Sequence, residues 1–148
     1  MNKSNFYYEF ENRFRGSRDQ VKRSLSGYNN LLDKIIHTTN GQPHLLDIGS
    51  GRGEWLEICK ERGFECVGID SNTIMNNLNS SLNLDILQGN VFDILPNLSS
   101  NKFDIITAFH FIEHISNDAL MTLLLECKRL LTSDGLLLLE TPSIDNLS

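Results

Sequence analysis

The chain has 148 residues, of which 40% are hydrophobic and 22% are charged. These proportions are ordinary for a globular domain, and the length is sufficient to bury a core. No apolar run approaches the roughly 20 residues of a membrane helix, and the polar, aromatic start does not have the pattern of a signal peptide. A net charge of −6 argues against a nucleic-acid partner, because such partners select a basic surface.

Three cysteines, Cys59, Cys66 and Cys127, lie in apolar stretches and form no C-x-x-C pair. This usage predicts buried free thiols and a cytoplasmic location, with neither a disulfide framework nor a metal site.

The spacing of apolar residues in the N-terminal 40 residues predicts helices. Aromatic residues recur at helical spacing in the first of them, which Gly16 and Ser17 end: Phe6, Tyr7, Phe10 and Phe14. A second helix is expected to start near Ser17 and to bury one apolar stripe: Val21, Leu25, Tyr28, Leu32 and Ile35. We expect residues 1–40 to pack as a helical segment on a core formed by residues 41–148.

The sequence of the core region predicts strands that alternate with helices. The expected strands are residues 44–48, 65–69, 84–87, 103–108 and 136–140, and the expected helices are residues 54–62, 73–80 and 117–131. Continuous apolar strands in such an alternation predict an α/β fold, with a parallel sheet covered on both faces. Ligands of such sheets bind beyond the carboxyl ends of the strands.

A glycine-rich loop follows the first of these strands. The chain reads Asp47-Ile-Gly49-Ser-Gly51-Arg-Gly53, and Asp70 ends the second strand. Glycines let the backbone approach a ligand closely, and an acid at the next strand end suits a ribose. A dinucleotide fingerprint would place a third glycine where Glu54 stands, and that carboxylate would repel a pyrophosphate. The pattern therefore favours a nucleoside cofactor without phosphate.

This register resembles motif I of the class I S-adenosylmethionine-dependent methyltransferases. The resemblance implies a Rossmann-like, doubly wound sheet of strand order 3-2-1-4-5, with Asp47 near the cofactor's ammonium and Asp70 on the ribose hydroxyls. S-adenosylmethionine carries an ammonium, a carboxylate and a sulfonium, so acids and backbone N–H groups suit it. The implied cofactor-binding positions lie in the loop, at the strand ends and near the N-terminus: Asp47, Gly49, Ser50, Gly51, Arg52, Gly53, Asp70, Ser71, Asn90, Val91, Phe109 and Arg15.

Two of these positions follow the third strand, where the family usually carries Gly-Asp-Ala. Here the chain reads Gly89-Asn90-Val91. The Asn90 oxygen can accept from an adenine amino group while the Val91 N–H donates to a ring nitrogen. The alternative is that Asn90 caps a turn.

The segment from Ala108 to Ile115 resembles the family's Glu-His segment beside the transferred methyl group. His110 and His114 are therefore the candidate general bases. The alternative for His114 is a local hydrogen bond to Glu113 that fixes the loop. Their spacing on a segment that is not clearly helical does not predict a metal pair.

Three further motifs resemble a bacterial methyltransferase subgroup associated with surface-polysaccharide synthesis. They are Phe-Glu-x-Arg-Phe-Arg-Gly-Ser-Arg near the start, Gly-Arg-Gly-Glu-Trp in the loop and Glu-Thr-Pro near the end. This resemblance implies O-methylation of a sugar or glycan acceptor. Arg13, Arg15 and Arg18 are then candidates for the cofactor carboxylate or an anionic acceptor, and the alternative is a solvated helix face.

The family usually continues with two more strands after the fifth. We therefore expect a longer parent protein, or a second copy in a homodimer, to cover strand five. Two rival functions remain: a non-catalytic S-adenosylmethionine-binding module, and a nicotinamide oxidoreductase that Glu54 disfavours.

Overall fold

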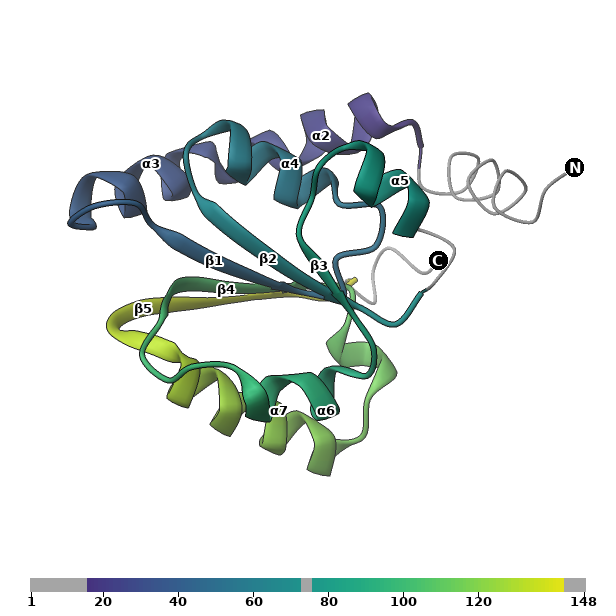
Figure 1. Ribbon diagram of the computed structural model, residues 1–148, viewed down its shortest axis with the longest axis vertical. Coiled ribbons are helices and arrows are strands. Elements are labelled where there is room, and N and C mark those ends of the chain that lie inside the picture. The colour runs from purple at the N-terminus through teal and green to yellow at the C-terminus, as the bar shows by residue number, and fades with distance from the viewer. Residues whose placement is uncertain (1–15, 73–75, 143–148) are drawn as a thin grey trace, which may run out of the picture.

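The computed structural model describes residues 16–72 and 76–142, and its centre is one parallel sheet. The five strands lie in the order β3-β2-β1-β4-β5 (Figure 1). Their bounds are β1 His44–Ile48, β2 Glu65–Asp70, β3 Ile86–Gln88, β4 Phe103–Phe109 and β5 Leu131–Glu140. The predicted α/β class and strand order are confirmed. The predicted first helix, with Arg13 and Arg15, lies outside the described residues.

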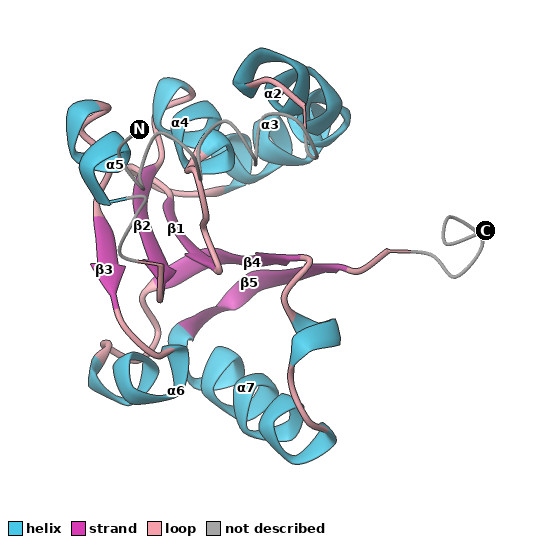
Figure 2. Cartoon of the chain, turned by 90° about the vertical axis from the view of Figure 1, so that its right-hand side faces the viewer, coloured by secondary structure: helices cyan, strands magenta, loops and turns pink. Residues whose placement is uncertain are grey.

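Helices cover both faces of the sheet (Figure 2). One face carries α2 (Arg18–Leu25), α3 (Asn29–Thr38), α4 (Glu54–Glu61) and α5 (Asn76–Ser81), and the other carries α6 (Val91–Ile94) and α7 (Asn117–Leu130). Consecutive residues of a strand point to opposite faces. Leu45 accordingly packs with the α3 and α4 core, and Leu46 with the α7 core. No helix in the described part of the chain is long and apolar enough to cross a membrane.

The helix predicted to run on from Ser17 is interrupted in the structure. It begins as expected, with a capping box in which Ser17 Oγ accepts from the Gln20 N–H at 3.2 Å. It ends at Leu25, and the 3-10 helix η1 (Ser26–Tyr28) separates it from α3. The Ser26 hydroxyl donates to the Arg23 carbonyl at 2.6 Å, and Gly27 follows. A hydroxyl bond to the backbone and a glycine both weaken a helix, which explains the break.

Strand β5 begins five residues earlier than the sequence predicts. Leu131 pairs with Phe103 and Leu136 pairs with Ile105, so residues 132–135 form an irregularity inside the strand. Ser133 to Gly135 therefore form a bulge inside β5 and not a turn that precedes it. The α6 helix and the 3-10 helices η3 (Leu95–Asn97) and η4 (Ile112–His114) are too short to show a periodic pattern in the sequence.

Candidate functional site

The glycine loop turns from the end of β1 over the end of β2. Gly49, Gly51 and Gly53 adopt φ angles of +72°, +53° and +77°, which favour glycine. The Gly49 and Ser50 N–H groups donate to the Ile69 carbonyl at 2.8 and 3.1 Å. A Cβ atom on Gly53 would lie 2.5 Å from a methyl carbon of Leu84. Both backbone conformation and space therefore require glycine in this loop.

Asp70 lies against this loop at the carboxyl end of β2. Its Oδ2 accepts from the Gly51 N–H at 2.8 Å, and its Oδ1 accepts from the Asn72 N–H at 2.7 Å. The residue is half-buried, and Ser71 beside it is exposed. Because a carboxylate has about four acceptor positions, Asp70 keeps capacity for ligand hydroxyls.

Asp47 is the buried acid of the site, with 2% of its surface exposed. Its Oδ1 accepts from the Thr107 hydroxyl at 2.8 Å, and Thr107 Oγ1 in turn accepts from the Trp55 indole N–H at 3.0 Å. Burial, the largest cause, and the charges of Asp70 and Glu54 together raise the pKa of Asp47 to about 7, although the hydrogen bond from Thr107 lowers it. Burying a charged carboxylate destabilises the fold, and a cationic ligand beside it would offset that cost.

A cavity of about 280 Å³ lies between the loop and α2. Ser50 Oγ in its wall is buried and has no hydrogen-bond partner within the described residues. Such a group indicates a missing partner. The lining comes from α2, the end of β1 with the loop, α4, and the ends of β4 and β5: Val21, Ser24, Leu25, Asp47, Gly49, Ser50, Arg52, Glu54, Trp55, Phe109, His110 and Glu140.

Arg52 connects the glycine loop to its neighbours. It is 2% exposed; its Nε lies 2.7 Å from Glu54 Oε1, and its Nη2 donates to the Gly16 carbonyl at 3.2 Å. Its own carbonyl accepts from Arg18 Nη1 at 2.7 Å. Arg52 lines the cavity and also holds the start of α2 against the loop.

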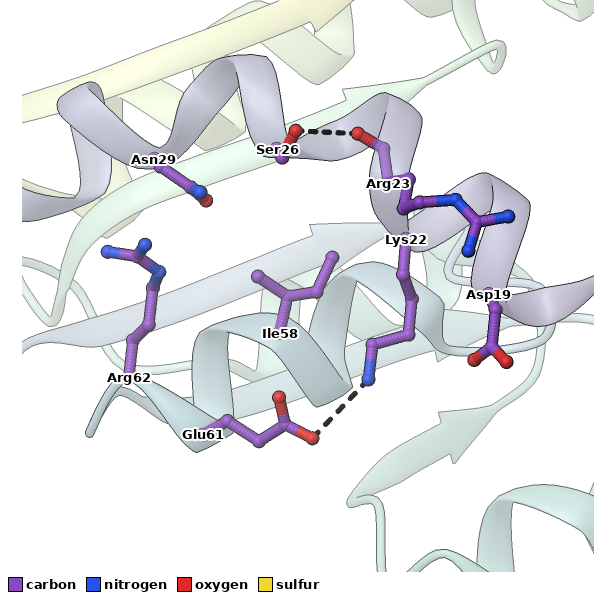
Figure 3. A pocket seen from close by; sticks show the side chains of 8 residues that line it. All are labelled: Asp19, Lys22, Arg23, Ser26, Asn29, Ile58, Glu61 and Arg62. Atoms are coloured by element: carbon purple, nitrogen blue, oxygen red, sulfur yellow. Dashed lines mark hydrogen bonds and ion pairs between the residues drawn. The ribbon is translucent and has the colours of Figure 1, made fainter.

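Ion pairs fasten α2 to α4 on the outer side of the cavity. Arg18 pairs with Glu57, and Lys22 lies 3.2 Å from Glu57 Oε1 and 3.4 Å from Glu61 Oε1. Figure 3 shows Lys22 reaching Glu61 across an open hollow between these helices. Burial raises the pKa of Glu57, but the hydrogen bonds and charges of Arg18 and Lys22 outweigh it, so the net shift is downward. Arg18 lies outside the cavity lining and, with 15% of its side chain exposed, does not belong to a solvated helix face either; it ties α2 to α4.

The two predicted bases differ in position. His110 lines the cavity, with Nε2 3.6 Å from Glu140 Oε1 and Nδ1 3.9 Å from Glu113 Oε1. His114 lies outside the cavity lining with 74% of its side chain exposed, and its Nε2 is 3.7 Å from Glu113 Oε1. The structure therefore brings His110, and not His114, to the cavity.

Asn90 and Val91 lie at the end of β3, outside that cavity. Asn90 caps α6, and its Oδ1 accepts from the Phe92 N–H at 2.8 Å. Val91 is buried. The Asn90 oxygen thus already has one partner and keeps one acceptor position.

Several functional neighbours were missed by sequence reasoning. Thr107 and Asn79 support Asp47 and the loop, since the Asn79 side chain donates to the Gly51 carbonyl at 3.3 Å. Tyr28 donates to Glu140, and burial together with this bond raises the pKa of Tyr28 to about 12. Glu140 had a usable signal, because it ends the fifth strand at the same edge as Asp70. Thr107, Asn79 and Tyr28 had no comparable signal.

The fold and site define a Rossmann-like domain with a nucleoside-cofactor edge. The chain belongs to the methyltransferase domain family, whose model matches residues 12–147. No protein of curated function matches it.

Three solved structures share this fold. A SAM dependent methyltransferase from Archaeoglobus fulgidus is 33% identical with a TM-score of 0.79, over 94% of this chain and 59% of that one. The bifunctional kinase-methyltransferase WbdD is 20% identical, with a TM-score of 0.64, over 83% of this chain and 29% of that one. Phosphoethanolamine N-methyltransferase 1 of Haemonchus contortus, solved with phosphoethanolamine and S-adenosylhomocysteine, is 15% identical with a TM-score of 0.63, over 95% of this chain and 32% of that one. The chain spans about six tenths of the first and a third of the others.

Proposed function

We propose that this chain binds S-adenosylmethionine at the carboxyl edge of the sheet and takes part in methyl transfer. The observation that carries the proposal is the pair of acids around one glycine loop. Asp70 is fixed by the Gly51 N–H, and the buried Asp47 lines the cavity beneath the loop. The family membership and the Archaeoglobus relative support the same cofactor.

The residues present fit this cofactor. Asp47 is a buried acid whose raised pKa reflects the lack of solvent, and an ammonium group there would offset the cost of burying its charged form. The unpartnered Ser50 hydroxyl is suited to a polar group of the methionine portion. Glu54 is buried in the first turn of α4, where it disfavours a pyrophosphate. S-adenosylmethionine meets these conditions and a dinucleotide does not.

When bound, the cofactor supplies an electrophilic methyl group on a sulfonium. The residues of the chain then have to align an acceptor with that group and exclude water. Trp55 and Phe109 form an apolar wall of the cavity, and α2 covers one side of it. His110 is the imidazole at the cavity that can take a proton from a hydroxyl acceptor.

The acceptor that we propose is a hydroxyl of a sugar or glycan in surface-polysaccharide synthesis. Its support is the motif resemblance around Arg15, Trp55 and Glu140, together with a base suited to a hydroxyl. Asp70, Asn90 and the loop then hold the cofactor.

The test has two stages. In a thermal-shift assay, S-adenosylmethionine and S-adenosylhomocysteine should raise the melting temperature, whereas NAD should not. The chain, together with any longer protein that contains it, is then assayed for transfer of a labelled methyl group to glycan termini and, in parallel, to ethanolamine phosphate. Transfer to glycans alone supports the proposal. Binding without transfer to either acceptor indicates the non-catalytic module, and stabilisation by NAD alone refutes the cofactor assignment.

A further inference from the structure

We propose that Glu140 is a positioning residue that fixes the ring of His110 for proton transfer, an inference that rests on the methyl-transfer function proposed above. The two residues are joined at the backbone, because the His110 N–H donates to the Glu140 carbonyl at 2.8 Å. Their side chains also approach, with Nε2 3.6 Å from Oε1. Catalytic hydrogen bonds are often this long before the ligands bind.

The backbone of His110 is unusual. Its φ angle is +54°, in the left-handed region that non-glycine residues rarely adopt. The surroundings must hold such a residue in place, and residues of this kind cluster at functional sites. Here the conformation occurs directly after β4 and accompanies a ring that lines the cavity.

Two carboxylates flank the ring, and Glu140 is the better held of them. It ends β5, where it pairs with Phe109 of β4, and its second oxygen accepts the Tyr28 hydroxyl. The Tyr28 ring in turn packs on Trp55 and Phe109, with centroids 5.7 and 5.5 Å apart. Glu140 is thus fixed by a strand and by an aromatic cluster.

Glu113 on the other side of the ring is less constrained. It lies in the 3-10 helix η4, and its Oε1 is shared between His110 Nδ1 at 3.9 Å and His114 Nε2 at 3.7 Å. Glu113 is also absent from the cavity lining, whereas Glu140 belongs to it. Of the two acids, Glu140 therefore sets the orientation of the ring.

The chemical role follows from the two ring nitrogens. When Nε2–H donates to Glu140, Nδ1 keeps its lone pair and can act as the base. The O–H bond of a hydroxyl acceptor then breaks and an N–H bond forms at Nδ1. The oxygen bonds to the methyl carbon, and the electron pair of the broken C–S bond remains on sulfur. The resulting imidazolium lies between Glu140 and Glu113, which stabilise its charge.

Direct observation of the ring N–H tests this role without an acceptor. A histidine ring N–H gives a one-bond proton–nitrogen NMR signal when a hydrogen bond protects it from exchange with water. We expect such a signal in the ¹⁵N-labelled chain. Its loss in the H110Q variant would assign the signal to His110. It should be lost in E140M, which keeps the side-chain length but removes the acceptor, and retained in the matched control E113M. A signal that persists in folded E140M, or is lost in E113M, overturns the proposal.

A second variant covers a failure of E140M to fold. E140Q keeps an acceptor at the same reach and removes the charge, so the ring N–H signal should persist but move upfield. An unchanged position would contradict a bond to Glu140. Binding of S-adenosylhomocysteine to the unsubstituted chain is measured on the same samples by calorimetry. Its absence refutes the proposed function, while the NMR result decides the placement of the ring.

Discussion

The buried acid of the site should destabilise the ligand-free protein, so its replacement should stabilise the fold. Burial raises the pKa of Asp47 from 3.8 to about 7. The folded form then holds a proton that the unfolded form has already released between about pH 4 and pH 7, so stability falls as the pH rises through that window. About three pKa units correspond to about 4 kcal/mol lost above pH 7.

The substitution D47N removes this charge and keeps an oxygen that can accept from Thr107. Relative to the unsubstituted chain, D47N should gain about 2 kcal/mol of unfolding free energy at pH 5 and about 4 kcal/mol at pH 8. The same variant should lose affinity for S-adenosylmethionine on the order of tenfold or more, because the ammonium loses its carboxylate. The expected pattern is a gain in stability with a loss of binding, as is common at functional sites.

Urea denaturation at both pH values measures the first effect, and calorimetry measures the second. D118N removes the same charge from an exposed position on α7 and controls for net charge. The difference in unfolding free energy between D47N and the unsubstituted chain should grow from pH 5 to pH 8, and a constant difference would contradict the raised pKa of Asp47. A D47N protein less stable at pH 8 would refute it as well.

Three further predictions concern the proposed ribose acid Asp70, the half-buried Tyr28 and the ion pairs that tie α2 to α4. D70A removes the acceptor of two loop N–H groups, so calorimetry should show affinity for S-adenosylhomocysteine falling on the order of tenfold; unchanged affinity contradicts this. In an ultraviolet titration, E140Q should lower the pKa of Tyr28 from about 12 toward 10, with Y28F identifying the transition; no movement contradicts the bond. In urea denaturation, E57Q should lower the free energy of unfolding by about 1 kcal/mol, because it breaks the ion pairs with Arg18 and Lys22. The exposed control E61Q should lower it by less, and equal losses would contradict the role of Glu57 in tying α2 to α4.

The order of the elements could be predicted because the strands carry short apolar runs, which in every strand but β4 are closed by a glycine or an acid. β1 matches its predicted bounds, and the predicted edge is where Asp70 meets the loop. The break before Tyr28 and the bulge after Leu131 could not be predicted. The break depends on the Ser26 hydroxyl bond to the Arg23 carbonyl and on Gly27, and the bulge depends on pairing with β4; apolar periodicity reports neither.

The site shows the same division. Residues that follow strands at one edge were found by their place in the chain, because parallel strands bring their carboxyl ends together. His110 was already the better placed histidine in the sequence, because it directly follows the strand. The structure adds the left-handed turn after β4 and Glu140 across the β4–β5 pair. Thr107 was hidden because a buried threonine in a strand is ordinary, and its importance comes from Asp47 and Trp55 on either side.

Isothermal titration calorimetry with S-adenosylhomocysteine measures whether the glycine loop and Asp70 hold this cofactor. The titrations use the unsubstituted chain and D70A, with NAD as the competing ligand. We expect one binding site for S-adenosylhomocysteine in the unsubstituted chain, a clear loss of affinity in D70A, and no binding of NAD. Binding of NAD without S-adenosylhomocysteine would contradict this expectation, and so would S-adenosylhomocysteine binding that is indifferent to Asp70.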